Sequence, residues 1–149
     1  MLKRQRLLQG VYRSTIEDGQ YGYHLSILFN LGTDMEQAEG NSTENYRIIP
    51  ANAFPTTQSE VQTTWSSLYA GVYNANDFLE RISSKINTYS DTDRQLATLY
   101  IAEARALRAM FYFELVRRYG NIALMTNTEM SKQDPRTFVQ VKPEKVYEF

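Results

Sequence analysis

The sequence predicts an all-α fold, built from tetratricopeptide-like antiparallel helix pairs with one long loop. Two observations carry this prediction. Apolar residues recur at spacings of three and four along most of the 149 residues, which is the period of an amphipathic helix. Two long segments of this kind also follow one another across a short link, which is typical of an antiparallel helix pair.

The first helix is expected over roughly residues 2–17, with Asp18-Gly19 ending it and the glycine in the left-handed cap position. The apolar run over residues 25–31 suits either a strand or a buried helix, because periodicity does not separate the two in a short run. We favour a helix, since the neighbouring segments are helical and no second strand is available to pair with it.

Residues 36–59 form the longest irregular stretch, rich in Gly, Asn, Pro and Thr, with no sustained period. Loops of this length in a compact domain are usually functional or disordered. A long helix is then expected from Ser59, a possible N-cap, to about Ile86. Its apolar stripe consists of Val61, Trp65, Leu68, Tyr69, Val72, Ala75, Leu79 and Ile82.

The second long helix is expected from Asp91, as its cap, to Tyr119, with Gly120 as its stop. Its middle is apolar on most faces, and three small side chains lie on one side (Ala102, Ala106 and Ala109), which predicts close packing on more than one neighbour. After a polar extended region, residues 143–149 read as the first turns of another helix. We therefore expect a piece of a longer protein.

Composition excludes several functions. The 16 basic and 17 acidic residues give a net charge of −1, which argues against nucleic acid as a partner and against a polybasic membrane tether. The chain has no cysteine and one histidine, His24, so thiol chemistry and the usual zinc sites are not expected. We expect no cofactor and no metal. No apolar run approaches the roughly 20 residues of a membrane span, and no signal peptide is apparent.

Two stretches carry a family resemblance. Residues 65–79 (WSSLYAGVYNANDFL) are similar to a W-x-x-L-Y-x-x-I-x-x-A-N helix, and residues 102–120 (AEARALRAMFYFELVRRYG) to an E-A-R-x-L-R-A-x-x-Y-F-x-L-V-x-x-Y-G helix. Both patterns are typical of the SusD/RagB family of outer-membrane nutrient-binding lipoproteins, and the chain resembles the N-terminal part of that family over residues 1–149. Ala123 stands where the family has proline, and the family's signal and lipid-bearing cysteine are absent from this sequence.

The resemblance implies a cell-surface lipoprotein of the outer membrane that binds oligosaccharides, or in some branches peptides, and is not an enzyme. It implies a TonB-dependent, SusC-like transporter as the partner. The alternative is a helical-repeat scaffold for protein–protein interaction, which would show broad protein interfaces and no affinity for sugars.

The candidate ligand-binding residues lie in the long loop. They supply amides, a guanidinium and two rings, a set suited to sugar hydroxyls and to the apolar face of a sugar: Asn41, Asn45, Tyr46, Arg47 and Phe54. A loop of this composition can equally be an exposed connector, and that alternative stays open.

Four residues are expected to be structural: Trp65, Asn76, Arg105 and Arg108. Trp65 and Asn76 lie in the apolar stripe, as a core ring and as a buried amide bonded to backbone. At least one of the two arginines is expected to be buried and paired with Asp34 or Asp77, because a cation on an apolar face needs a partner. His24 is expected to be a hydrogen-bonded, half-buried histidine. The helix face with Glu103, Glu114, Arg117 and Arg118 is expected to be solvated.

Overall fold

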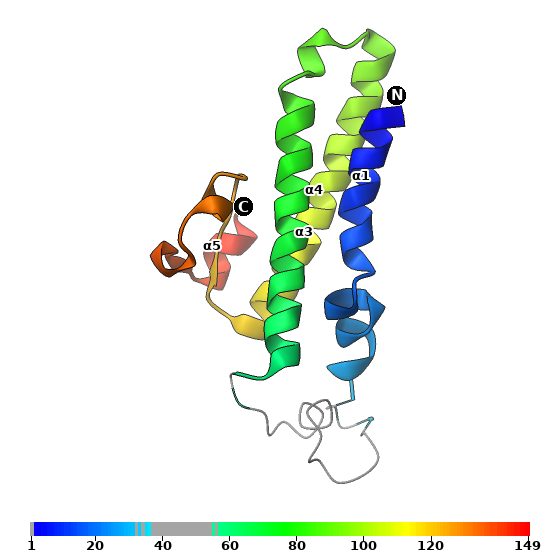
Figure 1. The fold of residues 1–149 in the computed structure, drawn as a ribbon. Helices are drawn as coiled ribbons and strands as arrows, with labels where there is room; N and C mark the ends of the chain where they lie inside the picture. Colours follow the sequence, from blue (N-terminus) through cyan, green and yellow to red (C-terminus); the bar gives the residue numbers. More distant parts are fainter. Residues whose placement is uncertain (1, 32, 34, 37–54, 56) are drawn as a thin grey trace. The chain divides into compact units, whose positions relative to one another are not determined.

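The computed structural model describes residues 2–31, 33, 35–36, 55 and 57–149 (Figure 1). Within this part of the chain the strands are two short segments, β1 (Ile122–Ala123) and β2 (Gln140–Val141), and the longer elements are helices. The predicted all-α class is confirmed. The predicted long loop falls mostly on residues 37–54, outside the described residues.

The chain forms two compact units. The large unit comprises residues 1–13 and 69–149, and the small unit comprises residues 14–68. Helices α1 (Leu2–Thr15) and α3 (Ser59–Ser83) contribute residues to both. Each unit has buried side chains of its own, from Leu8 and Val11 onward in the large unit and around Leu25 and Leu28 in the small one.

The large unit is built on an antiparallel pair, α3 and α4 (Asp91–Tyr119). Gly71 of α3 faces the ring of Phe111, whereas Asn76, further along α3, bonds to the earlier residue Arg108. A Cβ atom at Gly71 would lie 2.8 Å from the Phe111 ring carbons. The missing side chain therefore lets the fully buried Phe111 ring reach the α3 backbone.

The described residues of α1 in the large unit run parallel to α4 (Figure 1). Arg4 forms an ion pair with Asp93 at 2.9 Å and lies 4.2 Å from the centre of the Tyr89 ring. Two turns later, the Tyr12 hydroxyl donates to Glu103 at 2.8 Å. The residue number of the partner in α4 therefore increases with the residue number in α1, as it does between parallel helices.

Both predicted helix caps are wrong by one residue. The Ser90 hydroxyl, not Asp91, accepts the Asp93 N–H at 3.3 Å, and Asp91 is the first residue of α4. The carbonyl of Gln58 accepts the first bond of α3, from Gln62 N–H at 3.1 Å, so Ser59 is already helical. The predicted stop at Gly120 is confirmed, with φ of 70°, a conformation that glycine adopts without steric cost.

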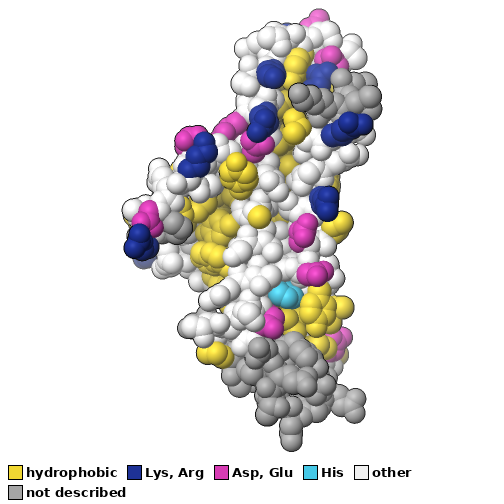
Figure 2. Space-filling model, viewed as in Figure 1, with side chains coloured by type: hydrophobic (Ala, Val, Ile, Leu, Met, Phe, Trp, Pro, Cys, Tyr) yellow, Lys and Arg dark blue, Asp and Glu magenta, His cyan; other side chains and the backbone are white. Residues whose placement is uncertain are grey.

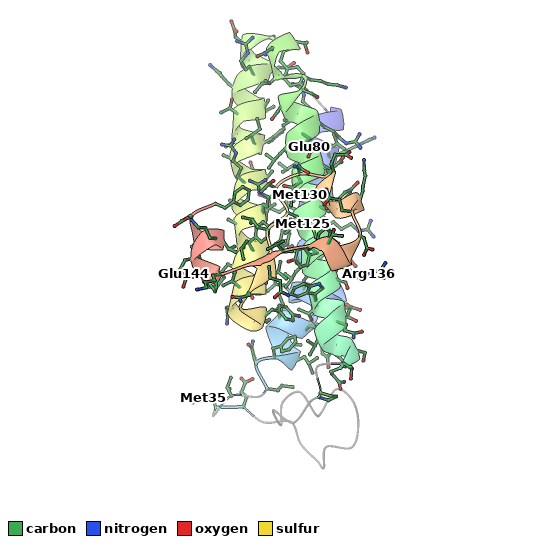
Figure 3. The ribbon with its side chains drawn as sticks, turned by 90° about the vertical axis from the view of Figure 1, so that its left-hand side faces the viewer. Met35, Glu80, Met125, Met130, Arg136 and Glu144 are labelled. Carbon is green, nitrogen blue, oxygen red and sulfur yellow. The ribbon has the colours of Figure 1, made fainter. Side chains whose placement is uncertain are left out.

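Residues 121–142 cross the α3–α4 pair before the chain enters α5 (Pro143–Tyr147) (Figure 3). The strands are antiparallel, with Ile122 opposite Val141. The Glu80 carboxylate of α3 accepts two bonds from Thr128, from its backbone N–H at 2.7 Å and its hydroxyl at 2.6 Å. These bonds fasten the crossing segment to α3. Pro143 is the first helical residue of α5, as predicted.

The small unit contains two π-helical turns, η1 (Asp18–Gly22) and η2 (His24–Leu28). The helical interpretation of residues 25–31 is thus supported over the strand. The predicted end of the first helix is wrong: α1 ends at Thr15, and Asp18-Gly19 opens η1. Gly19 is needed for close approach, because a Cβ atom there would lie 2.2 Å from the Ser67 hydroxyl oxygen.

Candidate functional site

The predicted ligand-binding set lies outside the described residues. Asn41, Asn45, Tyr46, Arg47 and Phe54 all fall within residues 37–54. Asp34, one of the two carboxylates offered as a partner for an arginine, is also outside them. For these residues the expectations from the sequence remain predictions.

A polar network in the large unit connects α3, α4 and the crossing segment. Asn76 is 1% exposed, and its Nδ2 donates to the Met125 carbonyl at 2.9 Å. The Arg108 guanidinium donates to Asn76 Oδ1 at 2.7 Å. The Tyr112 hydroxyl completes the network at Met125, which is labelled in Figure 3. Each buried polar group of Asn76 thereby has a partner, as buried amides require.

The ion pair proposed between an arginine and Asp77 is not formed. Asp77 instead accepts two bonds from Arg81 Nε, at 2.8 and 2.7 Å, one turn further along α3. Arg108 bonds to the neutral amide of Asn76 beside it. Arg105 is exposed. Two candidate partners were available to Arg108 at adjacent positions of α3, and helix geometry directs Asn76, not Asp77, toward it.

Arg105 and Arg108 line a pocket between α4 and α5, which we call the arginine pocket. Its volume is about 650 Å³, within the roughly 300–1,000 Å³ usual for small-molecule sites. Its lining residues are Arg105, Arg108, Ala109, Tyr112, Phe113, Val146, Tyr147 and Phe149. The pocket combines two cations with four aromatic rings.

Two rings of the arginine pocket, Tyr112 and Phe149, contact each other, and Phe149 also contacts Arg108. The guanidinium carbon of Arg108 lies 4.5 Å from the centre of the Phe149 ring, a cation–π arrangement. Phe149 meets Tyr112 edge to face at 6.0 Å. Burial raises the pKa of the Tyr112 phenol from its ordinary value of 10 to about 12. Burial lowers the pKa of Arg108. Tyr112 opposes this in part, and the neighbouring charge of Arg105 adds to the lowering of the pKa.

Sequence reasoning missed Tyr147 and Phe149 as pocket residues. They are 62% and 51% exposed and follow the buried Val146. The sequence pattern that could have indicated them is the pair of aromatic residues that follow Pro143, the first residue of a new helix. That pattern does not say which earlier helix the rings will face, because the answer depends on the path of residues 121–142.

The three-alanine side of α4 is not packed as predicted. Ala102, Ala106 and Ala109 are exposed, and the buried alanines of this helix are Ala97 and Ala104. α4 does contact several elements of the large unit, but through its other faces.

The expected solvated face of α4 also differs. Glu114 is only 3% exposed and forms ion pairs with Arg117, at 3.6 Å, and with Arg118. A buried carboxylate requires such partners, so this cluster is structural. Glu103, by contrast, accepts the Tyr12 hydroxyl at an exposed position.

In the small unit, Trp65 is half-buried. His24 is 7% exposed, more buried than expected, and its Nδ1 lies 2.8 Å from the Thr64 hydroxyl. Figure 2 shows the histidine with acidic side chains nearby, and Glu60 and Asp18 act on it electrostatically. Burial nevertheless dominates and lowers the pKa of His24.

The described residues contain neither a metal-binding cluster nor a membrane-spanning helix. No group of three or more His, Cys, Asp or Glu residues among them is arranged to hold a metal ion. No helix formed by them is long and apolar enough to cross a membrane.

The described part of the chain is a helical scaffold with an internal polar network, and comparisons with known proteins place it in a family. A family model described as "Starch-binding associating with outer membrane", SusD-like, matches residues 1–146. The crystal structure of a SusD homolog from Bacteroides thetaiotaomicron matches with a TM-score of 0.94 and 68% identity, covering 97% of this chain and 27% of that one. The chain therefore belongs to the SusD-like family.

Two further proteins are similar to this chain, one in sequence and one in fold. A SusD-like protein of Formosa agariphila is 32% identical over 97 residues, which are 62% of this chain and 18% of that protein. A SusD superfamily protein from Bacteroides vulgatus has the same fold, with a TM-score of 0.83 at 16% identity, over 97% of this chain and 31% of that one. The chain thus spans less than a third of the length of each of these relatives.

Proposed function

We propose that the protein captures oligosaccharides at the outer surface of a bacterial cell and passes them to a TonB-dependent, SusC-like transporter in the outer membrane. The observation that carries this proposal is the match of a starch-binding, outer-membrane family model to residues 1–146. The 68% identity to a solved SusD homolog supports it. Binding peptides in place of glycans is the alternative within the same family.

The proposed action is binding without catalysis. The described residues offer little for bond-breaking chemistry, since the buried histidine faces Thr64 and the buried carboxylate, Glu114, is engaged by two arginines. A general acid or base needs a reachable reacting group. The proposed location is the outer membrane, with a lipid anchor of the kind the family carries.

The proposed ligand contacts are those of the long loop: Asn41, Asn45, Tyr46, Arg47 and Phe54. A ring stacks on the apolar face of a sugar, while planar amides and guanidinium groups bind paired hydroxyls. The amides and the guanidinium lie close in sequence to one of the rings, which suits a single contact surface.

Affinity electrophoresis tests the proposal. The protein is run through native gels that contain a panel of plant, host and microbial polysaccharides, starch included, with serum albumin as a non-binding control. We expect retardation by at least one polysaccharide and no release of reducing ends on long incubation. Unretarded migration in every gel, together with affinity for peptides, would favour the peptide-binding alternative. Release of sugars would contradict binding without catalysis.

A further inference from the structure

The arginine pocket carries a positive charge that the described protein does not neutralise. Elsewhere among the described residues, six arginines lie within 4 Å of a carboxylate: Arg4, Arg81, Arg94, Arg117, Arg118 and Arg136. Arg105 and Arg108 form no such pair with any described residue, and no acidic residue lines their pocket. Arg108 is bonded to an amide and stacked on a ring, both of them neutral.

Four acidic residues on the neighbouring stretches of chain are already engaged. Glu103 accepts the Tyr12 hydroxyl, Glu114 pairs with Arg117 and Arg118, and Glu148 pairs with Lys145 at 2.7 Å. Asp77, adjacent to Asn76, is held by Arg81. Neutralising the arginine pocket with any of these four carboxylates would require breaking its present interaction.

A guanidinium removed from water is stabilised most by an anion, and its planar fork matches a carboxylate. Arg108 is half-buried, and the charge of Arg105 adds to its own. The two arginines occupy positions three apart on one face of α4, so both can address a ligand in the same pocket. The pocket is therefore built to favour an anionic group.

The aromatic rings narrow the class of ligand that the pocket can bind. Phe113, Tyr147 and Phe149 are 47%, 62% and 51% exposed, and they stand beside the two cations. A pyranose ring presents C–H faces that stack on aromatic rings, and a uronic acid carries a carboxylate on such a ring. We propose that the arginine pocket is a subsite for a uronate residue of an acidic oligosaccharide. This proposal rests on the proposed function and names its ligand class.

Calorimetry with three trisaccharides tests this. The protein is titrated with trigalacturonate, with the carboxyl-reduced neutral trisaccharide made from it, and with maltotriose. We expect trigalacturonate to bind at least about tenfold more tightly than its reduced form, since hydrogen bonds to a charged group are the stronger ones. We expect this advantage to shrink as salt rises from about 20 to 500 mM.

Variants locate the binding. Arg105→Gln removes an exposed guanidinium while Arg108 remains, and it should reduce the preference for trigalacturonate. Tyr147→Ala should weaken the binding of trigalacturonate and of its reduced form alike. Arg94→Gln is the matched control, because it removes an exposed arginine of α4 outside the pocket. Far-ultraviolet circular dichroism checks that each variant folds, and Tyr147→Ala keeps the test available should Arg105→Gln not fold.

Three outcomes would overturn the uronate subsite. Equal affinity for trigalacturonate and its reduced form would do so while leaving glycan capture intact. An equal loss of the preference for trigalacturonate in Arg105→Gln and in Arg94→Gln would assign that preference to general surface charge. Tighter binding of a tri-glutamate peptide than of trigalacturonate would assign the pocket to polypeptide carboxylates. Absence of binding to every glycan here and in the electrophoresis panel would contradict the proposed function as well.

Discussion

Tyr112 and Met125 exchange two hydrogen bonds: the Tyr112 hydroxyl donates to the Met125 carbonyl at 2.6 Å and accepts the Met125 N–H at 2.8 Å. One phenol thereby satisfies both backbone polar groups of a residue just after β1. Since the Met125 carbonyl also accepts from Asn76, the crossing segment is joined to α3 and α4 at a single peptide. The path of this segment sets where α5 meets α4, and so forms the arginine pocket.

Tyr112→Phe should lower stability while keeping the shape of the side chain. It leaves the half-buried Met125 N–H without its partner, and an unpaired backbone group removed from water costs about 1–3 kcal/mol. Urea unfolding followed by circular dichroism measures the loss. Tyr147→Phe is the control, because it removes a phenol from an exposed ring, and we expect it to change stability by less than about 0.5 kcal/mol. Equal effects of the two substitutions would contradict the role given to the Tyr112 hydroxyl.

Asn76 and Arg108 should be coupled in stability. Asn76→Ala and Arg108→Met each break their shared bond, and we expect each to cost about 1–3 kcal/mol. The double variant should cost less than the sum, with a coupling of about 0.5–3 kcal/mol for residues in direct contact. A full double-mutant cycle by urea unfolding measures it. Arg105→Met is the control: this arginine lies on the same helix but is exposed, so its loss should lower the free energy of unfolding only slightly. If the effects of Asn76→Ala and Arg108→Met add up in the double variant, the bond between the two residues contributes nothing to stability.

Gly71→Ala should destabilise the protein although alanine favours helices. The gain in helix propensity is about 1 kcal/mol, but the new methyl group meets the buried Phe111 ring, and overpacking costs about 1–3 kcal/mol. Gly10→Ala is the matched control. No atom lies within 4 Å of its added Cβ, so it should stabilise by about 0.5–1 kcal/mol. Thermal unfolding should place the two variants on opposite sides of the parent, and a stabilised Gly71→Ala would contradict the close approach of α3 and Phe111.

His24 should make stability depend on pH in a defined window. Burial lowers its pKa below the ordinary value of 6.5, so near that pH the unfolded chain binds a proton that the folded chain does not. The stability contributed by the neutral ring is fully present above about pH 6.5 and is lost as pH falls through the lowered folded pKa. Because His24 is the only histidine, melting temperatures between pH 7.5 and 5 should report this directly. His24→Gln should flatten the profile, and an unchanged slope would contradict the assignment.

Tyr46→Ala and Phe54→Ala should each reduce affinity for the polysaccharide identified by electrophoresis, by about tenfold. Each substitution removes a ring that we assign to sugar stacking. Retardation in gels of graded polysaccharide content measures the dissociation constant. The control is Tyr73→Ala, an exposed tyrosine of α3. Unchanged retardation of both loop variants would leave residues 36–59 as an exposed connector.

The sequence was sufficient for the helices and for the family. The period of apolar residues in α3 and α4 and the stop at Gly120 arise from neighbours within a few positions, and a single sequence displays such local patterns. The two cap positions were wrong by one residue, because Ser59, Ser90 and Asp91 are all acceptable caps and the choice depends on backbone geometry. The two π-helical turns had no signal in the spacing of the apolar residues.

The arginine pocket was beyond sequence reasoning. At least one of Arg105 and Arg108 was expected to pair with Asp34 or Asp77. Arg108 bonds to Asn76, 32 positions away, because the relative rotation of α3 and α4 decides which side chain faces it. Glu114 was expected to be solvated and is buried, since its exposure depends on what covers that part of α4. The sequence by itself therefore determined the long helices, through interactions between near neighbours, and its motifs identified the family. The tertiary structure decided which polar groups meet and which cations are left without an anion, because those depend on distances between residues far apart in the chain.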